Sequence, residues 1–282
     1  MIELGPNRYG KSAIRLVKVT RGPDGHRVRD LTVAVALEGD FGVAHTDGDN
    51  ATLVATDTMK NTVYALAPEH LSGAVEAFGL VLAEHFLGAT AVSRSTITIR
   101  EHHWEPIPTD GGPAPDAFLR VGDRTRIAVV SAARDGRVTV EGGIEDLTVM
   151  KTGRSAFAGF PRDEFTTLPD TDDRIMATKV SAIWRYGGSD LDWDAIHDGV
   201  VGTLLDVMAV HQSPSVQASI FIVGRAILER HVALDEVRMV LPNLHHWTYD
   251  LTPFGLENRS EIFVATTEPH GLIEATVRRS DR

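Results

Sequence analysis

The stretch SGAVEAFGLVLAEHFLGATAVSRSTITIREHHW, residues 72–104, decides the fold because its pattern returns later in the chain. An offset of 245 − 102 = 143 residues superposes it without a gap on residues 215–247. Six positions are then identical, whereas average residue usage would give roughly two. The identical pairs are Ser72 and Ser215, Phe78 and Phe221, Ala83 and Ala226, and the His-His-Trp triplets that begin at His102 and His245. This repetition favours an internal duplication.

The first half of the chain is predicted to have the element order ββααββ. β-branched residues with partial alternation indicate strands, and GPDGH at 22–26 is typical of a hairpin turn. Apolar residues at helical spacing indicate two helices that Pro68 separates, and TDGGPAP at 109–115 has the composition of a loop. The predicted elements are strands at 12–21 and 28–39, helices from Thr56 to about Ala67 and at 71–87, and strands at 90–107 and 116–132.

The second half repeats this order. It has predicted helices at 191–211 and 214–231, and predicted strands near 175–186, 233–251, 261–267 and 271–278. The pattern predicts an α+β fold with two antiparallel four-stranded sheets, each carrying a helix pair on one face. We expect one domain at residues 1–138 and the other at 139–282.

The composition is that of a globular protein of about two domains, with 282 residues, 43% hydrophobic and 24% charged. A formal charge of −11 argues against binding to nucleic acid or to an anionic membrane, both of which need a basic field. The absence of cysteine excludes disulfides, a thiolate nucleophile and cysteine-based metal sites. No run reaches the roughly 18 apolar residues of a spanning helix, and no signal peptide or peroxisomal ending is recognisable. We therefore expect a cytoplasmic protein.

One literal motif points to a different class of protein. GPNRYGKS, residues 5–12, satisfies the phosphate-binding pattern G-x-x-x-x-G-K-S. That loop needs a preceding strand and a following helix, whose N–H groups face the phosphates. Here only MIEL precedes the motif, and the strand-like IRLVKVT follows it. We therefore reject nucleotide hydrolysis.

The 12 histidines do not form a recognisable metal-binding motif. Adjacent histidines on a strand point to opposite faces, so neither His-His pair can chelate a metal locally. No His-Glu-x-x-His sequence is present. We expect no metal site.

Six segments follow one another along nearly the whole chain. They are YGKS at 9–12, ATDTMKNTVYALA at 55–67, GFPRDEFTTL at 159–168, DDRI at 172–175, SVQ at 215–217 and LPNLHH at 241–246. In this order they resemble the urate oxidases (uricases) of the bacterial type, which belong to the tunnelling-fold (T-fold) family. The resemblance implies tandem T-fold repeats that assemble into an oligomeric barrel, a homotetramer with active sites at subunit interfaces. A monomer should then be inactive.

The same resemblance implies the reaction. Urate would be oxidised by dioxygen to 5-hydroxyisourate with release of hydrogen peroxide, in purine breakdown and with water as a reactant. No flavin, haem or copper would be needed, because the electron-rich urate dianion reduces dioxygen itself. The protein would supply orientation and proton management.

The resemblance also implies the site residues. Lys11, Thr56 and His245 would form the catalytic proton relay, for which a neutral histidine is suited. Arg174 would meet one edge of the purine with two parallel donors, Gln217 would read the opposite edge, and Phe157 would stack on the ring. The Val216 backbone would lie alongside, Asn243 would hold dioxygen or water above the plane, and Asp57 extends the substrate-binding set. Lys11, Thr56 and Asp57 would come from a neighbouring subunit.

The residues alone leave other interpretations open. Lys11 can be a solvated lysine, Thr56 a helix N-cap, and Arg174 a surface ion-pair partner of Asp172 or Asp173. Two rival functions also stay open: a zinc-dependent pterin enzyme of the same fold, and a non-catalytic purine- or pterin-binding relative. The second rival would keep Arg174, Gln217 and Phe157 and lose the Lys–Thr pair, which this chain retains.

Overall fold

The structure is a computed structural model that describes residues 2–122 and 124–280. The chain divides into two compact units. Unit 1 comprises Met1–Gly143 and Arg185–Asp194, and unit 2 comprises Ile144–Trp184 and Ala195–Arg282. The domain boundary expected between residues 138 and 139 stays a prediction.

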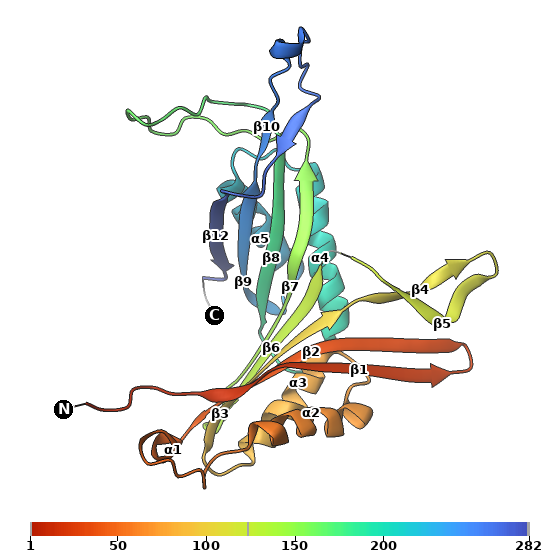
Figure 1. Cartoon of the computed structure of the whole chain (residues 1–282), viewed down its shortest axis with the longest axis vertical. Helices are drawn as coiled ribbons and strands as arrows, with labels where there is room; N and C mark the ends of the chain where they lie inside the picture. The colour runs from red at the N-terminus through yellow and green to blue at the C-terminus, as the bar shows by residue number, and fades with distance from the viewer. Residues whose placement is uncertain (1, 123, 281–282) are drawn as a thin grey trace. The chain divides into compact units, whose positions relative to one another are not determined.

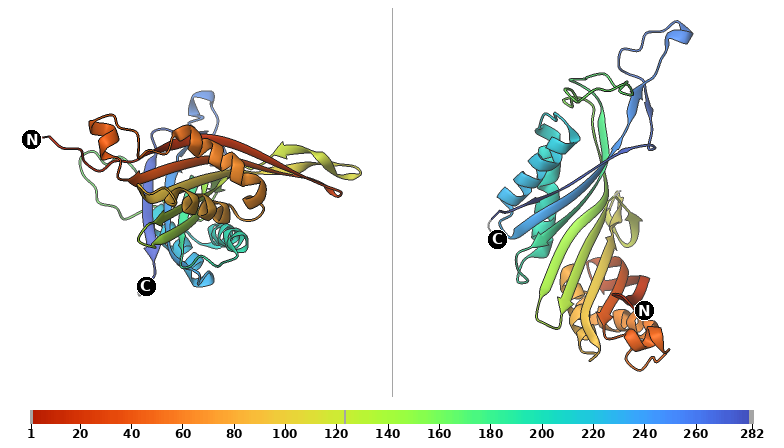
Figure 2. Two further views of the ribbon diagram at one scale, coloured as in Figure 1. Left: turned by 90° about the horizontal axis from the view of Figure 1, so that it is seen from below. Right: turned by 90° about the vertical axis from the view of Figure 1, so that its left-hand side faces the viewer.

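Unit 1 is built on a sheet of strand order β1-β2-β3-β6 (Figure 1). Its paired strands are antiparallel, and α2 and α3 cover one face (Figure 2). Alternate residues of β2, from Leu31 to Leu37, are at most 2% exposed and form the core under the helices. The elements are β1 (Tyr9–Gly22), β2 (Gly25–Gly39), α1 (Gly42–Thr46), α2 (Thr56–His70), α3 (Val75–Leu87), β3 (Val92–His102), β4 (Trp104–Thr109), β5 (Gly112–Arg120) and β6 (Thr125–Ala133).

Unit 2 repeats this design with the strand order β7-β8-β9-β12. The helices α4 and α5 cover one face of this sheet (Figure 2), and β10 pairs with β11 in a separate small ribbon. The elements, of which β7, β8 and α4 each have one end among the residues of unit 1, are β7 (Val138–Lys151), β8 (Met176–Tyr186), α4 (Trp193–Val210), α5 (Val216–Arg230), β9 (Leu234–Leu244), β10 (His246–Thr248), the short 3-10 helix η1 (Thr252–Phe254), β11 (Phe263–Ala265) and β12 (Gly271–Arg278).

An arginine in each unit supports the duplication. Arg134 follows β6 and donates hydrogen bonds to the carbonyls of Leu87, Ala89 and Val92, at the end of α3. Arg279 follows β12 and donates to the carbonyls of Leu228, His231 and Leu234, at the end of α5. A cation at a helix C-terminus satisfies orphan carbonyls and complements the helix dipole. The same interaction therefore closes the second helix of each repeat.

The single offset of 143 residues does not hold for every element of the two repeats. β3 and β9 begin at Val92 and Leu234, and 234 − 92 = 142; they end at His102 and Leu244, and 244 − 102 = 142. The identity of the two His-His-Trp triplets favoured 143, but strand boundaries depend on sheet pairing, which an ungapped comparison does not detect. The ends of α3 and α5 are related by 143, since 230 − 87 = 143, so the repeats keep their element order without one fixed offset.

Three local predictions need correction. Pro68 does not interrupt the helix, since α2 continues to His70. Lys18 donates to the carbonyls of Ala67, Pro68 and Leu71 and so satisfies carbonyls at the C-terminal end of this helix. Residues 109–115 are not a loop, because Thr109 pairs with Gly112 in the β4–β5 hairpin. This ribbon tolerates proline because it has only two strands, whose outer edges are free. The predictions also omitted β7 and α1.

The motif GPNRYGKS was predicted to run into a strand and not into a phosphate-binding loop. This prediction is confirmed, because Gly10, Lys11 and Ser12 lie inside β1. Within the described residues, no helix combines the length and apolar character that a membrane span requires.

Candidate active site

A short ribbon in unit 2 holds the predicted aromatic platform and the predicted arginine. Phe157 and Thr171 exchange backbone hydrogen bonds of 2.8 and 3.0 Å. The carbonyl of Ser155 accepts the N–H of Arg174 at 2.8 Å. On the other side, Ser213 accepts from the N–H of Ala156 at 2.7 Å and donates to Arg154 at 2.9 Å. These bonds fix Phe157 and Arg174 next to each other although they are 17 residues apart (174 − 157).

Arg174 is a half-buried cation that has no counter-ion within the part of the chain that the structure describes. Its guanidinium carbon lies 5.2 Å from the centre of the Phe157 ring, and its Nε is buried without a hydrogen-bond partner. Burial alone lowers the pKa of Arg174 from its ordinary value. In the described part of the chain it forms no ion pair with Asp172 or Asp173, so the ion-pair interpretation is wrong. An unpaired, partly desolvated guanidinium favours an anionic ligand.

Phe157 and Arg174 line a cavity of about 550 Å³ in unit 2. Asn243, at the end of β9, and His245, which follows it, line the same cavity. Asn243 Nδ2 lies 3.5 Å from His245 Nδ1. The remaining lining residues are Thr152, Leu168, Pro169, Thr171, Asp173, Ile175, His246, Trp247, Thr248, Ser260 and Phe263.

The surroundings of His245 favour its neutral form. Its ring stacks on Trp247 with centroids 5.1 Å apart and planes 23° apart. Burial, then the positive charge of Arg174, then His270 lower the pKa of His245 below 6.5. A neutral imidazole can both accept and donate a proton, which a relay requires.

The two predicted residues of α5 lie outside this cavity's lining. Val216 is buried at the first position of the helix, and Gln217 is exposed at the second. The Ser215 hydroxyl caps the helix by accepting the N–H of Ala218 at 3.1 Å. The helix start follows Ser213, which pairs with the ribbon beside Phe157. The segment that leads into α5, and so precedes Gln217, is therefore hydrogen-bonded to that ribbon.

Lys11, Thr56 and Asp57 lie together in unit 1. A β-bulge follows Lys11, with Ala13 in the left-handed region at φ 55°, and such bulges redirect side chains. Hydrogen bonds from Lys60 and Asn61 lower the pKa of Asp57, and the charge of Lys11 adds to this effect. Lys11 is therefore close enough to the start of α2 to act on it electrostatically.

Thr56 is not the N-cap of α2. The cap position belongs to Ala55, no side chain caps the helix, and Thr56 is its first residue and exposed. The cap interpretation is therefore wrong, and the hydroxyl lies at the positive end of the helix dipole.

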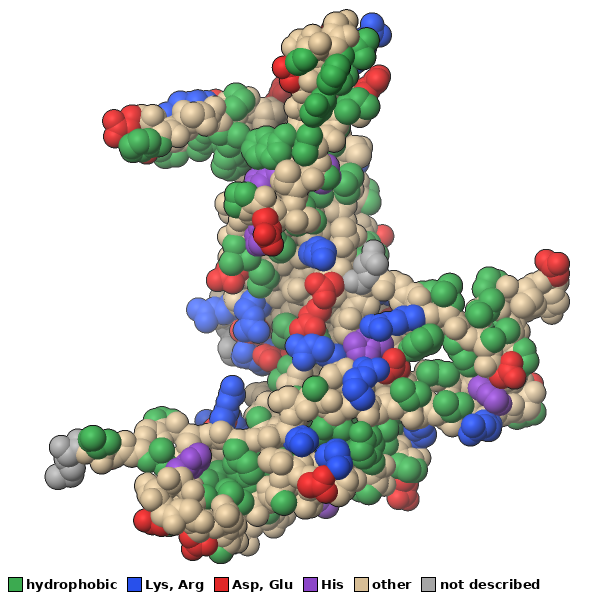
Figure 3. All heavy atoms as spheres, viewed as in Figure 1, with side chains coloured by type: hydrophobic (Ala, Val, Ile, Leu, Met, Phe, Trp, Pro, Cys, Tyr) green, Lys and Arg blue, Asp and Glu red, His purple; other side chains and the backbone are tan. Residues whose placement is uncertain are grey.

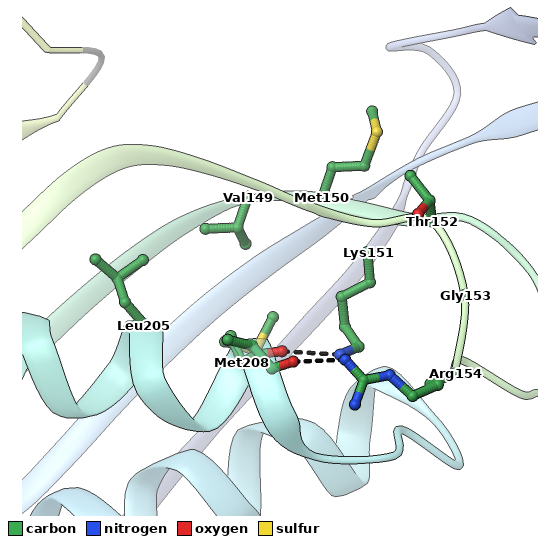
Figure 4. Close-up of a pocket in the computed structure, with 9 residues that line it drawn as sticks. Val149, Met150, Lys151, Thr152, Gly153, Arg154, Leu205 and Met208 are labelled. Atoms are coloured by element: carbon green, nitrogen blue, oxygen red, sulfur yellow. Dashed lines mark hydrogen bonds between the residues drawn. The ribbon is translucent and has the colours of Figure 1, made fainter.

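A second hollow, shown in Figure 4, is lined by the cations Lys151 and Arg154, but both are already bonded to backbone carbonyls and do not form an anion site. Lys151 Nζ donates to the carbonyl of Met208 at 2.8 Å, and Arg154 donates to the carbonyl of Ala209 at 2.7 Å. Both cations thus satisfy the C-terminal carbonyls of α4.

Sequence reasoning missed several residues of the site. Trp247 belongs to the repeated His-His-Trp triplet, a signal that could have identified it. Phe160 stacks on Phe157 with centroids 4.9 Å and planes 13° apart; it lies in the segment GFPRDEFTTL, but no role was predicted for it. Asp173 and Ser213 act through backbone hydrogen bonds, which a sequence does not reveal.

The cavity of unit 2 has the chemistry of a binding site for a planar anionic heterocycle: a free guanidinium, aromatic faces, an amide and a neutral imidazole. Among the described residues, no group of three or more His, Cys, Asp or Glu side chains could hold a metal ion.

Comparison with known proteins identifies the family. The uricase family model matches residues 7–131 and 140–274. The uricase of Arthrobacter globiformis is 45% identical over 279 residues, which cover 99% of this chain and 90% of that protein. The uricase of Dictyostelium discoideum is 35% identical and covered at 99% for both chains. The chain belongs to the uricase family.

Solved structures agree. The crystal structure of the Arthrobacter globiformis uricase superposes with a TM-score of 0.94 at 44% identity, covering 100% of this chain and 96% of that one. A uricase structure from Bacillus fastidious has a TM-score of 0.84 at 24% identity, covering 98% and 94%, and supports the fold alone. The predicted family and the predicted α+β fold of tandem repeats are confirmed.

Proposed function

We propose that this protein is a urate oxidase, which converts urate, dioxygen and water to 5-hydroxyisourate and hydrogen peroxide without a bound cofactor. The observation that carries the proposal is the unpaired Arg174 guanidinium facing the Phe157 ring in a cavity that also contains His245. Urate is a flat anion, so it matches a site with an aromatic face and one uncompensated positive charge. Membership of the uricase family agrees with this choice.

Arg174 and Gln217 orient the substrate in this proposal. The Arg174 fork donates to one edge of the urate anion, the Gln217 amide reads the opposite edge beside the Val216 backbone, and Phe157 stacks on the ring. Fixing the ring in one orientation lowers the entropic barrier to reaction with dioxygen.

Lys11, Thr56 and His245 move protons. The relay removes a second proton from urate, and the resulting dianion transfers one electron to dioxygen. The urate radical and superoxide recombine to a hydroperoxide, while Asn243 holds dioxygen or water above the ring. Loss of hydrogen peroxide and addition of water then give 5-hydroxyisourate, so that the two electrons lost by urate appear in the peroxide.

A homotetramer completes the site in this proposal. Lys11, Thr56 and Asp57 of one subunit would join the cavity residues of a neighbour. The segment from β10 to β11 supports an assembly because it exposes large apolar side chains, visible as green spheres at its tip (Figure 3). They are Trp247, Tyr249, Phe254, Leu256, Ile262 and Val264. Sedimentation at increasing protein concentration tests the assembly, and cell fractionation tests the cytoplasmic location that the sequence suggests.

Urate consumption tests the reaction itself. Protein treated with a chelator and freed of flavin should consume urate and produce peroxide at the rate of untreated protein. Activity that disappears on chelation and returns with zinc would favour the zinc-dependent pterin enzyme. Bound but unchanged urate would favour the non-catalytic relative.

A further inference from the structure

The carboxylate of Asp173 is directed to the backbone, although the residue directly precedes Arg174. Asp173 Oδ1 accepts the N–H of Arg154 at 2.7 Å, and a Cβ added to Gly153 would lie 3.4 Å from the same oxygen. The carbonyl of Ser155, in the same turn, accepts the N–H of Arg174 at 2.8 Å. Two consecutive residues, Asp173 and Arg174, therefore hold the turn of residues 153–155.

The conformation of this turn needs such contacts. Arg154 has φ 58°, in the left-handed region that residues with a side chain disfavour. Its guanidinium donates to the carbonyls of Ala209 and Val210 at the end of α4, at 2.7 and 3.1 Å. Asp173, which lines the cavity, accepts the backbone N–H of Arg154. The turn is thus held from both directions, and Phe157 follows it by three residues (157 − 154).

The same hydrogen bond has an electrostatic consequence. A carboxylate adjacent in sequence is well placed to form an ion pair with Arg174, which would neutralise the charge that an anionic ligand needs. Within the described residues no such pair forms, and burial alone lowers the pKa of Arg174. The backbone hydrogen bond keeps the Asp173 carboxylate occupied elsewhere.

We propose that Asp173 is a positioning residue for substrate binding: by accepting the Arg154 N–H, it fixes the turn that holds Arg174 and keeps its own carboxylate off the Arg174 guanidinium. This inference rests on the proposed function, since the ligand it serves is the urate anion.

Three variants test the proposal. Asp173→Ala removes the acceptor and should raise KM for urate, and Kd for a non-oxidisable purine analogue, about tenfold with kcat within about twofold. Asp173→Asn keeps an oxygen acceptor without the charge and should restore most of the affinity. Asp172→Ala is the matched control, because Asp172 is exposed and lies outside the cavity lining; its constants should equal those of the wild type.

Three results would overturn the role of Asp173: wild-type affinity in Asp173→Ala, a fall in kcat at unchanged KM, or equal impairment of Asp173→Asn and Asp173→Ala. If Asp173→Ala does not fold, Asp173→Asn decides, because wild-type KM supports the role and raised KM contradicts it. Wild-type protein that binds no purine would instead overturn the proposed function, so the two failures are distinguishable.

Discussion

The guanidinium carbon of Arg174 lies 5.2 Å from the centre of the Phe157 ring, and no carboxylate among the described residues pairs with this cation. A flat anion that stacks on the ring can reach the guanidinium edge with its acceptor atoms. Arg162 has a similar contact with Phe160 at 5.1 Å, but it also pairs with Asp170 at 3.2 Å. A carboxylate therefore compensates the charge of Arg162, whereas the charge of Arg174 is available to an anionic ligand.

Arg174→Ala should weaken substrate binding. Charge-assisted hydrogen bonds contribute about 1.5–3 kcal/mol each, so Kd for a non-oxidisable purine analogue should rise about 10-fold to 100-fold. Calorimetric titration measures the change. Arg162→Ala removes a guanidinium from the neighbouring ring and should bind the analogue as the wild type does. Equal affinity of Arg174→Ala and the wild type would make Arg174 a structural residue.

Thr56→Val should reduce turnover and leave binding intact. Loss of a proton-transfer group costs about 10²-fold to 10⁴-fold in kcat. Removal of an N-cap lowers the free energy of unfolding by about 1 kcal/mol. Because Ala55 and not Thr56 is the cap residue, Thr56→Val should not lose this stability, and its melting temperature should equal that of the wild type. Steady-state kinetics and a melting curve check both parts. Thr58→Val, in the same helical turn, is the control, and unchanged kcat in Thr56→Val would exclude the relay role.

The pH profile of kcat/KM should report His245. Its pKa is lowered from 6.5, so the neutral form persists below that pH and the acidic limb of the profile should lie on the acid side of it. Arg174 is the larger of the two charges that lower this pKa, and His270 is the smaller. His270→Asn should move the acidic limb to higher pH, and Arg174→Ala should move it further. A limb that moves to lower pH in either variant would contradict this assignment.

Arg126 should be essential for the stability of unit 1. It donates to Glu76 at 2.7 Å and to Asp194 at 2.6 Å, and Glu76 is 0% exposed. Arg126→Met leaves a buried carboxylate unpaired, which costs about 3–5 kcal/mol in the free energy of unfolding. The exposed pair of Arg137 and Asp135 provides the control, since Arg137→Met should cost at most about 1 kcal/mol.

The loss in Arg126→Met should grow with pH. Burial raises the pKa of Glu76 above 4.5, and the charge of Arg126 opposes that rise. Without Arg126 the folded protein retains the Glu76 proton to higher pH, so the penalty is small below the unfolded pKa and increases as pH rises through the folded pKa. Urea denaturation at about pH 5 and about pH 8 measures the difference. A loss that is the same at both pH values would show that Glu76 is not the unpaired group.

Much of the fold was predictable, because local pattern determines it. The β1–β2 hairpin, α3, α4, α5 and β12 follow from β-branched alternation, turn residues and helical spacing. The loop predicted at 109–115 is wrong because Thr109 and Gly112 pair across the β4–β5 hairpin, although the composition of this segment is that of a loop. The predicted break at Pro68 also failed: α2 continues to His70, and Lys18, 50 residues from Pro68 in the sequence, donates to the Pro68 carbonyl.

The site was predictable in its residue types and not in its supporting contacts. Arg174, Phe157, Asn243 and His245 were named from the family resemblance, and the structure brings them into one cavity. The sequence suggested Asp173 as a possible ion-pair partner of Arg174. Its observed hydrogen bond to the Arg154 backbone depends on the left-handed conformation of Arg154, which no residue pattern predicts. The predicted roles of Val216 and Gln217 stay predictions, since both lie outside the cavity's lining.

Oxygen consumption by the wild-type protein tests the central claim most directly. Protein freed of metal and flavin, mixed with urate in air, should take up one dioxygen and release one hydrogen peroxide for each urate consumed. Urate loss without oxygen uptake, or uptake that requires an added metal or flavin, would contradict a cofactor-free urate oxidase.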